Sequence, residues 1–279
     1  MAKIVAAYAV PHTPSFVADV AQTGASHEAA RFFASIKSHL DQANADTFVL
    51  IQNDHFNTFF FNNWPTFAIG VAKSAYGPSD QTPSMPKYQV EIEQSLASLL
   101  LEYLVTAGFD FSASHELSLD HGVLVPLHFL TPEMKRPIVP IFINCLMPPL
   151  PLARRCYALG QALNKAIETW PVDSRIAVIA SGSLSLEVGG PLIEPGKTFG
   201  VPDRKWAARV LEFVKNSQHS ELLDEATPVR MAEAGNVGGE LLNWIALLGI
   251  VGHAQPSIVI EQPALGNAFA AWSLDGANS

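Results

Sequence analysis

Short apolar segments alternate with segments of helical periodicity along this chain of 279 residues. Apolar runs bounded by Pro, Gly or polar residues are typical of buried strands. We predict strands at 3–10, 47–52, 138–144, 175–180 and 257–261, and helices at 90–107, 153–169, 206–215 and 240–248. One more helix, with Ser26 as its N-cap, is predicted from the helical spacing of Phe32, Phe33, Ile36 and Leu40. Residues 64–87, which hold several Pro, Gly and Ser residues, predict a long loop region.

The alternation of strands and helices favours a sheet that is covered by helices on both faces. The sequence contains no repeat, no low-complexity tract and no clear linker. We therefore predict one α/β domain over residues 1–279, with a central mixed sheet. Apolar residues make up 48% of the chain, and a chain of this length buries roughly three quarters of its unfolded surface, so a large core is expected.

The charge and the cysteines exclude several classes of protein. The net charge is −9 and there is no basic run, so binding to nucleic acid is not expected. Cys145 and Cys156 are predicted to be reduced, buried thiols. The chain has neither a signal-peptide pattern nor a run of ~18 uninterrupted apolar residues, so we expect a cytoplasmic protein that does not contact a membrane.

Two histidines follow predicted strands at the points where the strands end. His12 comes after 3–10, between Pro11 and Pro14, and His55 comes after 47–52. Ligands in α/β sheets bind outside the carboxyl ends of the strands, so the two imidazoles are candidates to share a metal ion. The neighbouring Asn53 and Asp54 are candidates to accept hydrogen bonds from a ligating imidazole.

Glu240 is a candidate third ligand, because a carboxylate that opens an apolar helix needs a partner if it is buried. Two histidines and one carboxylate form the set that holds Fe(II) and leaves one face of the ion open. Each residue alone has an ordinary interpretation. A histidine after a strand is more often a loop or core residue, and Glu240 alone is more typical of a charge at a helix N-terminus.

Several longer motifs resemble those of the class III extradiol dioxygenases, most of all the catalytic (β) subunits of the protocatechuate 4,5-dioxygenase type. The resemblance covers nearly the whole chain. Its motifs are HTP at 12–14, NDH at 53–55, WPTFAIG at 64–70, LDHGVLVPL at 119–127, RRCYALG at 154–160, GGP at 189–191 and GNVGGELLNW at 235–244.

The resemblance implies an Fe(II)-dependent enzyme that opens a catechol-type ring beside its diol with O₂, in the catabolism of aromatic compounds. It implies that His12, His55 and Glu240 bind the metal and that His121, in DHG, acts as an acid/base near the catechol. It also implies either a homo-oligomer or a separate small helical partner subunit.

One position departs from the family pattern. The family usually has a second acid/base histidine after a serine in the loop that follows 175–180, whereas here Ser185 is followed by Leu186. Leucine neither donates nor accepts a proton. Glu187 or His121 is then expected to cover the proton transfers, although a solvated loop carboxylate is an equally good interpretation of Glu187. Leu186 is also consistent with a substrate that needs less acid/base help, or with a weakened metal-binding subunit.

The substrate pocket is predicted beside the second histidine and the departing loop. Phe56 and Asn57 follow His55, and an apolar pocket with a few polar groups suits a flat ring. We predict that Phe56, Asn57, Ser185 and Leu186 contact the substrate. A metal-dependent hydrolase is the rival enzyme class, because Zn²⁺ accepts the same ligands.

Overall fold

The computed structural model describes residues 1–275. Its main sheet has eight strands in the order β11-β12-β1-β8-β2-β7-β3-β6. The strands of this sheet are β1 (Lys3–Val10), β2 (Thr47–Gln52), β3 (Phe67–Gly70), β6 (Phe111–Ser114), β7 (Ile138–Ile143), β8 (Arg175–Ser181), β11 (Ile258–Gln262) and β12 (Asn267–Ser273). Two small antiparallel pairs lie outside it: β4 (Ser74–Gly77) with β5 (Tyr88–Glu91), and β9 (Glu187–Val188) with β10 (Phe199–Gly200).

The sheet is mixed, as predicted. The central strands β1, β8, β2 and β7 run parallel, whereas β12 is antiparallel to β1 and β3 is antiparallel to β7. Every residue of β2 and β7 is buried, and so is all of β1 except its first residue. Fully buried strands of this kind are typical of parallel sheets that have both faces covered.

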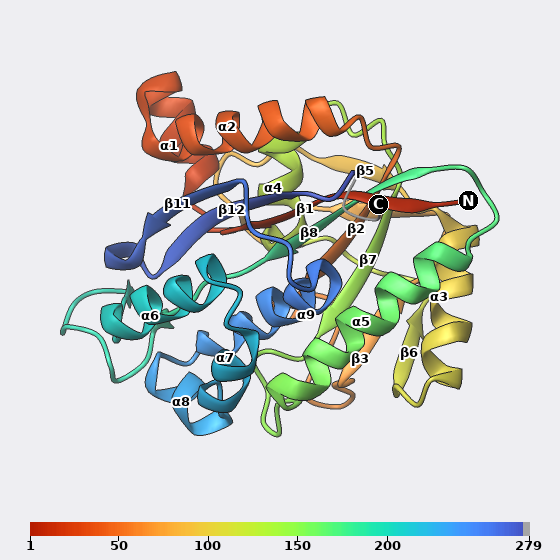
Figure 1. Cartoon of the computed structure of the whole chain (residues 1–279). Helices are drawn as coiled ribbons and strands as arrows, with labels where there is room; N and C mark the ends of the chain where they lie inside the picture. Colours follow the sequence, from red (N-terminus) through yellow and green to blue (C-terminus); the bar gives the residue numbers. More distant parts are fainter. Residues whose placement is uncertain (276–279) are drawn as a thin grey trace.

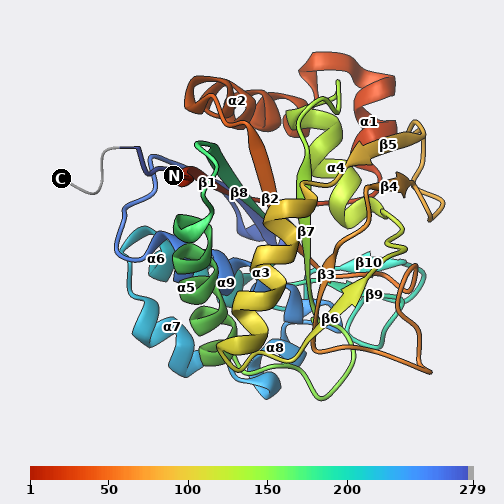
Figure 2. The same ribbon diagram turned by 90° about the vertical axis from the view of Figure 1, so that its right-hand side faces the viewer.

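Helices cover both faces of the sheet (Figures 1 and 2). On one face α2 and α4 pack together, and on the other face α9 lies against β1, β8 and β2 and packs on α5, which in turn contacts α3. The α-helices are α1 (Phe16–Thr23), α2 (Glu28–Ala43), α3 (Gln94–Thr106), α4 (His121–Leu130), α5 (Ala153–Thr169), α6 (Arg204–Lys215), α7 (His219–Glu225), α8 (Pro228–Glu233) and α9 (Leu241–Val251). Within residues 1–275, no helix combines the length and the apolarity that crossing a bilayer requires.

The structure corrects several predicted boundaries. The N-cap of α2 is His27, whose side chain accepts a hydrogen bond from the Ala29 N–H, whereas Ser26 donates to the Thr23 carbonyl oxygen one turn earlier. The predicted loop 64–87 contains β3 and β4, and the predicted helix 90–107 begins only after β5. The strand β12, which pairs with β1, was not predicted, since 267–273 lacks a clear alternating pattern.

The parallel strands place their carboxyl ends at one edge of the sheet. In register, Val10 at the end of β1 is opposite Ser181 at the end of β8, and Ile51 of β2 is opposite Ala180. The segments that leave these strands therefore meet. They begin at Pro11, Asn53 and Gly182, and they carry the first two predicted metal ligands.

Candidate metal centre

Three predicted ligands converge at this edge of the sheet. His12 follows β1, His55 follows β2, and Glu240 ends the short 3₁₀ turn η2 (Gly238–Glu240) that leads into α9. The Glu240 Oε1 atom lies 3.0 Å from the Nε2 atom of His12 and 3.4 Å from the Nε2 atom of His55. Glu240 is completely buried and His12 is almost so, which makes this a protein-enclosed set of two imidazoles and one carboxylate.

The backbone around Glu240 holds its carboxylate in place. The Ser183 N–H donates to Glu240 Oε2 at 2.7 Å, and the Asn53 amide nitrogen lies 3.3 Å from Oε1. Gly182 allows the close approach of η2, because a Cβ atom at that position would lie 2.9 Å from the Cβ of Glu240. The polar loop after β8 and the glycine-rich turn before α9 thus fit against each other at the carboxylate.

Each of the two imidazoles that are predicted to bind the metal has a partner on its Nδ1 side. His12 Nδ1 hydrogen-bonds to Ser181 Oγ at 2.7 Å. His55 Nδ1 lies 3.0 Å from Asp120 Oδ2, and the same oxygen accepts the His55 backbone N–H at 2.8 Å. Partners of this kind orient a metal-binding imidazole and leave its Nε2 atom for the metal.

The electrostatics of the site couple the acids to the imidazoles. Burial by itself would lower the pKa of His55, but the Asp120 and Glu240 carboxylates raise it to about 10. Burial likewise works to raise the pKa values of Asp120 and Glu240, yet the neighbouring histidines hold both well below their ordinary range. Both carboxylates are therefore ionised at neutral pH, and the buried negative charge of Glu240 suits a cation.

A third imidazole completes the cluster. His121, the first residue of α4, offers a ring nitrogen that lies within 4.8 Å of ring nitrogens of both His12 and His55. Its ring stacks on that of His55 with 3.9 Å between centroids, and it lies edge-on to His12 at 5.4 Å. The four side chains can hold a metal ion either with two histidines and Glu240 or with three histidines.

Comparison with known proteins identifies the family of this chain. The family described as the catalytic LigB subunit of aromatic ring-opening dioxygenase matches residues 6–267. The chain belongs to the LigB family of class III extradiol dioxygenases. The predicted family is thereby confirmed.

Relatives of this LigB-family chain are named as dioxygenases. A 2,3-dihydroxyphenylpropionate/2,3-dihydroxicinnamic acid 1,2-dioxygenase of Paraburkholderia xenovorans is 31% identical over 217 residues, which cover 77% of this chain and 65% of the relative. The gallate dioxygenase of Pseudomonas putida is 35% identical over 150 residues, which cover 52% of this chain and 42% of the relative. The chain spans about half the length of the first of the curated relatives that it matches. An uncharacterized Escherichia coli K12 protein, JW3007, shares the fold with a TM-score of 0.64 at 17% identity, covering 96% of this chain and all of that one.

The loop that is predicted to depart from the family pattern, at Ser185 and Leu186, lies beside η2. The Leu186 carbonyl oxygen accepts the Val237 N–H at 3.1 Å, and the Leu186 side chain is half-buried. Ser185 is fully buried, and its hydroxyl donates to the Ala234 carbonyl oxygen and accepts the Asp203 N–H. These contacts hold the loop in place, and the prediction that Ser185 and Leu186 contact substrate stays a prediction.

Glu187 is buried against backbone. Its carboxylate accepts the Asn236 N–H at 2.5 Å and lies 3.5 Å from the Leu192 nitrogen. A Cβ atom at Gly190 would lie 1.7 Å from Glu187 Oε1, so the loop folds tightly over this side chain. The alternative of a solvated carboxylate is wrong, since Glu187 is only 1% exposed, and the acid/base role predicted for it stays a prediction.

The residues after His55 form a tight turn. Phe56 has a positive φ of 60°, and its ring packs 4.7 Å from Trp64 and 5.1 Å from Phe61 between centroids. The Asn57 amide donates to the His55 carbonyl oxygen at 2.9 Å and lies 3.3 Å from Asp120. Asn57 thus supports the predicted ligand His55, and the substrate contacts predicted for Phe56 and Asn57 stay predictions.

Sequence reasoning misplaced two acceptors and missed the partners that the imidazoles have. The Asn53 amide oxygen accepts from Asn243 at 3.2 Å, and the Asn53 amide nitrogen, which cannot accept, lies 3.1 Å from His55 Nε2. Asp54 accepts the backbone N–H groups of three residues in the turn, Asn57, Thr58 and Phe59, and no imidazole. The His55 and His121 imidazoles instead face Asp120 and Asp80, and His12 faces Ser181. For Asp120, the only signals in the sequence were the DHG motif and the position before a helix. Asp80 lies in a segment that was predicted only as a loop.

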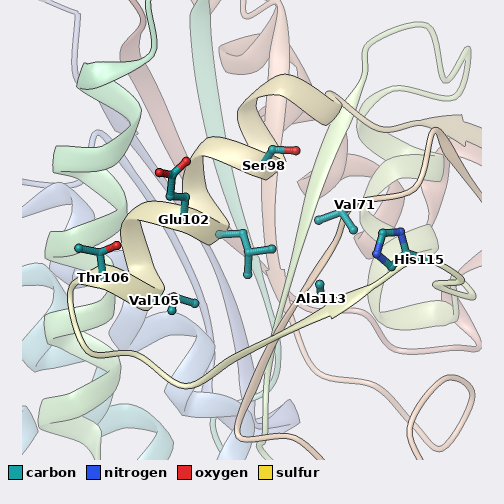
Figure 3. Close-up of a pocket in the computed structure, with 8 residues that line it drawn as sticks. Val71, Ser98, Glu102, Val105, Thr106, Ala113 and His115 are labelled. Atoms are coloured by element: carbon teal, nitrogen blue, oxygen red, sulfur yellow. The ribbon is translucent and has the colours of Figure 1, made fainter.

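A surface pocket of about 470 Å³ lies elsewhere, between α3 and β6 (Figure 3). Its lining includes Val71, Glu102, Val105 and His115. None of the predicted site residues lines it, so the candidate metal centre rests on converging side chains and not on this pocket.

Proposed function

We propose that this chain is an Fe(II)-dependent extradiol dioxygenase that opens a catechol-type ring beside its diol with O₂. The observation that carries the proposal is the convergence of the Nε2 atoms of His12 and His55 on the Glu240 carboxylate. Two imidazoles and one carboxylate are the donor set of non-heme Fe(II) oxygenases. The family and the named relatives support the same reaction.

The residues present fit such an ion. Glu240 is ionised, completely buried and free of any Lys or Arg partner among the described contacts, so a cation would balance its charge. Bound Fe(II) would act as a template for the diol and O₂ and would stabilise developing negative charge. The chain's own part is to present the three ligands and to shield them from water.

His121 is our candidate for the proton transfers. It stacks on His55 beside the ligand set, and its pKa is lowered by burial and by the nearby His55, which favours the neutral, proton-accepting imidazole. It would accept a proton from a catechol hydroxyl and return it to the opened ring. Because the position expected to hold the second histidine is Leu186, one imidazole would serve both steps. Glu187 is a weaker candidate because its carboxylate is occupied by backbone N–H groups.

The substrate class is proposed from the relatives. Their names include 2,3-dihydroxyphenylpropionate and gallate, both aromatic rings with adjacent hydroxyl groups. We propose an aromatic diol together with O₂, bound by one catalytic domain that spans residues 1–279. A homo-oligomer or a small helical partner subunit stays a prediction.

A metal-dependent hydrolase is the second candidate, because the three imidazoles alone form a donor set that Zn²⁺ also accepts. Glu240 lies within 3.4 Å of both His12 and His55, so a metal bound by these histidines also meets the carboxylate. Zn²⁺ accepts this donor set as Fe(II) does, so the metal that supports turnover and the need for O₂ separate the two candidates.

The test is anaerobic reconstitution with Fe(II) followed by a panel of catechols that includes gallate, protocatechuate and 2,3-dihydroxyphenylpropionate. We expect stoichiometric O₂ uptake and a yellow ring-opened product with at least one of them, lost in Glu240→Ala. Glu261→Ala is the matched control, since it removes a surface carboxylate that pairs with Lys215. Tight Fe(II) binding without O₂ uptake on any catechol would refute the proposal, and anaerobic turnover with Zn²⁺ would establish the hydrolase.

A further inference from the structure

The His121 imidazole has an acidic partner of its own, which comes from a separate part of the fold. Asp80 lies in the segment 78–87 that joins β4 to β5, the two strands of a small antiparallel sheet. Its Oδ2 atom hydrogen-bonds to His121 Nδ1 and also accepts the His121 backbone N–H at 3.2 Å. One carboxylate oxygen thus contacts both the side chain and the backbone of this histidine.

The contact is built into the surrounding structure. The Thr82 hydroxyl donates to the other Asp80 oxygen, Oδ1, at 2.5 Å. The backbone of the hairpin is joined to the segment before α4 by Ser79 N–H to the Leu119 carbonyl oxygen and by Leu119 N–H to the Tyr76 carbonyl oxygen, each at 2.9 Å. The Thr82 hydroxyl and the backbone bonds between the hairpin and the segment before α4 therefore both hold Asp80 beside His121.

A glycine allows this close approach. A Cβ atom at Gly77 would lie 2.2 Å from the Leu119 carbonyl oxygen, so no larger residue fits without moving the hairpin away from α4. The approach brings Asp80 to the cluster although His121 lies 41 positions further along the sequence.

We propose that Asp80 is a positioning residue for His121: it accepts the Nδ1 proton, holds the ring in one orientation, and leaves Nε2 as the acceptor that faces the metal centre. An ionised carboxylate has no proton to donate, so the shared proton belongs to Nδ1. Burial works to raise the pKa of Asp80, but its bonds to His121 and Thr82 lower it to about 2, which keeps it ionised.

The catalytic part of this inference rests on the proposed dioxygenase. A single imidazole that serves as both base and acid needs a defined tautomer. In the tautomer with its proton on Nε2, the ring points that proton at the substrate hydroxyl and cannot accept another. Asp120 has the same relation to His55, but His55 is a ligand. The two stacked rings are thus oriented by two separate carboxylates, one for metal binding and one for proton transfer.

The test measures the tautomer directly. In protein labelled with ¹⁵N-histidine, at pH 8, spectra that correlate ring nitrogens with ring protons separate a protonated from an unprotonated Nδ1, and His121→Gln assigns the signal. We expect a protonated Nδ1 and a bare Nε2 in the wild type, and a mixture of tautomers in Asp80→Asn. Asp80→Glu is expected to restore part of the wild-type signal.

Activity and metal binding form the second arm. In Asp80→Asn we expect kcat to fall roughly 10–100-fold, while KM for the catechol and the affinity for Zn(II) stay within about twofold. Tyr88→Phe is the matched control, because its hydroxyl joins the same hairpin to α4 through His128 Nδ1 at 2.7 Å. It should change none of these quantities.

Two outcomes would overturn the inference. One is an unchanged His121 tautomer in Asp80→Asn. The other is a loss of Zn(II) affinity that parallels the loss of kcat, with a metal-bound shift at His121 Nε2 in the Zn(II)-loaded protein, because His121 would then be a ligand. If the wild type cleaves no catechol, the proposed function fails, yet the tautomer still decides the role of Asp80.

Discussion

The Asp120 carboxylate binds His55 at two atoms, the backbone nitrogen at 2.8 Å and the ring Nδ1 at 3.0 Å, through the same oxygen. The other carboxylate oxygen caps α4 by accepting the Gly122 N–H at 2.8 Å. One side chain therefore fixes the orientation of His55, a predicted metal ligand, and the start of the helix that carries His121. Helix capping and ligand positioning depend on each other at this point.

The first prediction concerns this carboxylate. Asp120→Asn is expected to weaken Zn(II) binding roughly 10–100-fold, because the His55 ring loses the acceptor that sets its tautomer. Isothermal titration calorimetry measures the affinity. Asp46→Asn is the control, since Asp46 accepts the Arg175 N–H at 2.8 Å at the opposite end of the strands and should affect only stability. Equal affinities in the wild type and Asp120→Asn would contradict the role given to Asp120.

The second prediction separates two glycines that both lie in tight contacts. Gly182→Ala should push Glu240 away from the two histidines and lower the metal affinity, because its Cβ would lie 2.9 Å from the Glu240 Cβ. Gly160→Ala should instead destabilise the packing of α5 on α9 by about 1–3 kcal/mol, because its Cβ would lie 1.9 Å from the Ala246 carbonyl oxygen. Calorimetric metal titration measures the affinity of both variants, and urea unfolding measures their stability. Lower metal affinity in Gly160→Ala together with unchanged affinity in Gly182→Ala would refute the prediction.

The third prediction distinguishes the two candidates for proton transfer. His121→Gln is expected to lower kcat by roughly 10²–10⁴-fold, the usual effect of losing an acid/base group. Glu187→Gln is expected to lower the melting temperature, since the buried carboxylate binds the backbone of Asn236, and to leave the pH profile of kcat unchanged. A shifted pH profile in Glu187→Gln would give the catalytic role to Glu187.

The fourth prediction concerns pH and stability far from the metal centre. Burial, and then the neighbouring His253, lower the pKa of His219, while Glu221 works weakly in the other direction, and the His219 ring also contacts the Tyr157 hydroxyl at 3.3 Å. The folded state thus binds this proton less readily than the unfolded chain does. The contribution of neutral His219 is fully present above the unfolded value of about 6.5 and is lost as pH falls from there through the lower pKa of the folded state.

The expected result is a smaller loss of stability on acidification when the histidine is absent. Urea midpoints measured between pH 7.5 and 5 should fall less steeply for His219→Gln than for the wild type. Parallel curves for the two proteins would show that His219 does not contribute to the pH dependence.

The sequence by itself predicted the fold class because the fully buried strands read as continuous apolar runs. Thr47–Gln52 and Ala153–Thr169 were bounded correctly, since polar residues and prolines mark their ends. His12 and His55 could be predicted for a related reason: parallel strands place the segments that leave them at one edge of the sheet. The family motifs strengthened the candidate Glu240, which alone is more typical of a charge at a helix N-terminus, and only these motifs named His121.

Tertiary structure decided which carboxylate meets which imidazole. Asp54 is adjacent to His55 in the sequence but turns to the backbone of the following loop, whereas Asp120, 65 residues after His55, accepts the ring. Asp80 reaches His121 only because the β4–β5 hairpin packs against the start of α4. The direction of a side chain depends on the packing of distant segments, and no local pattern records that packing.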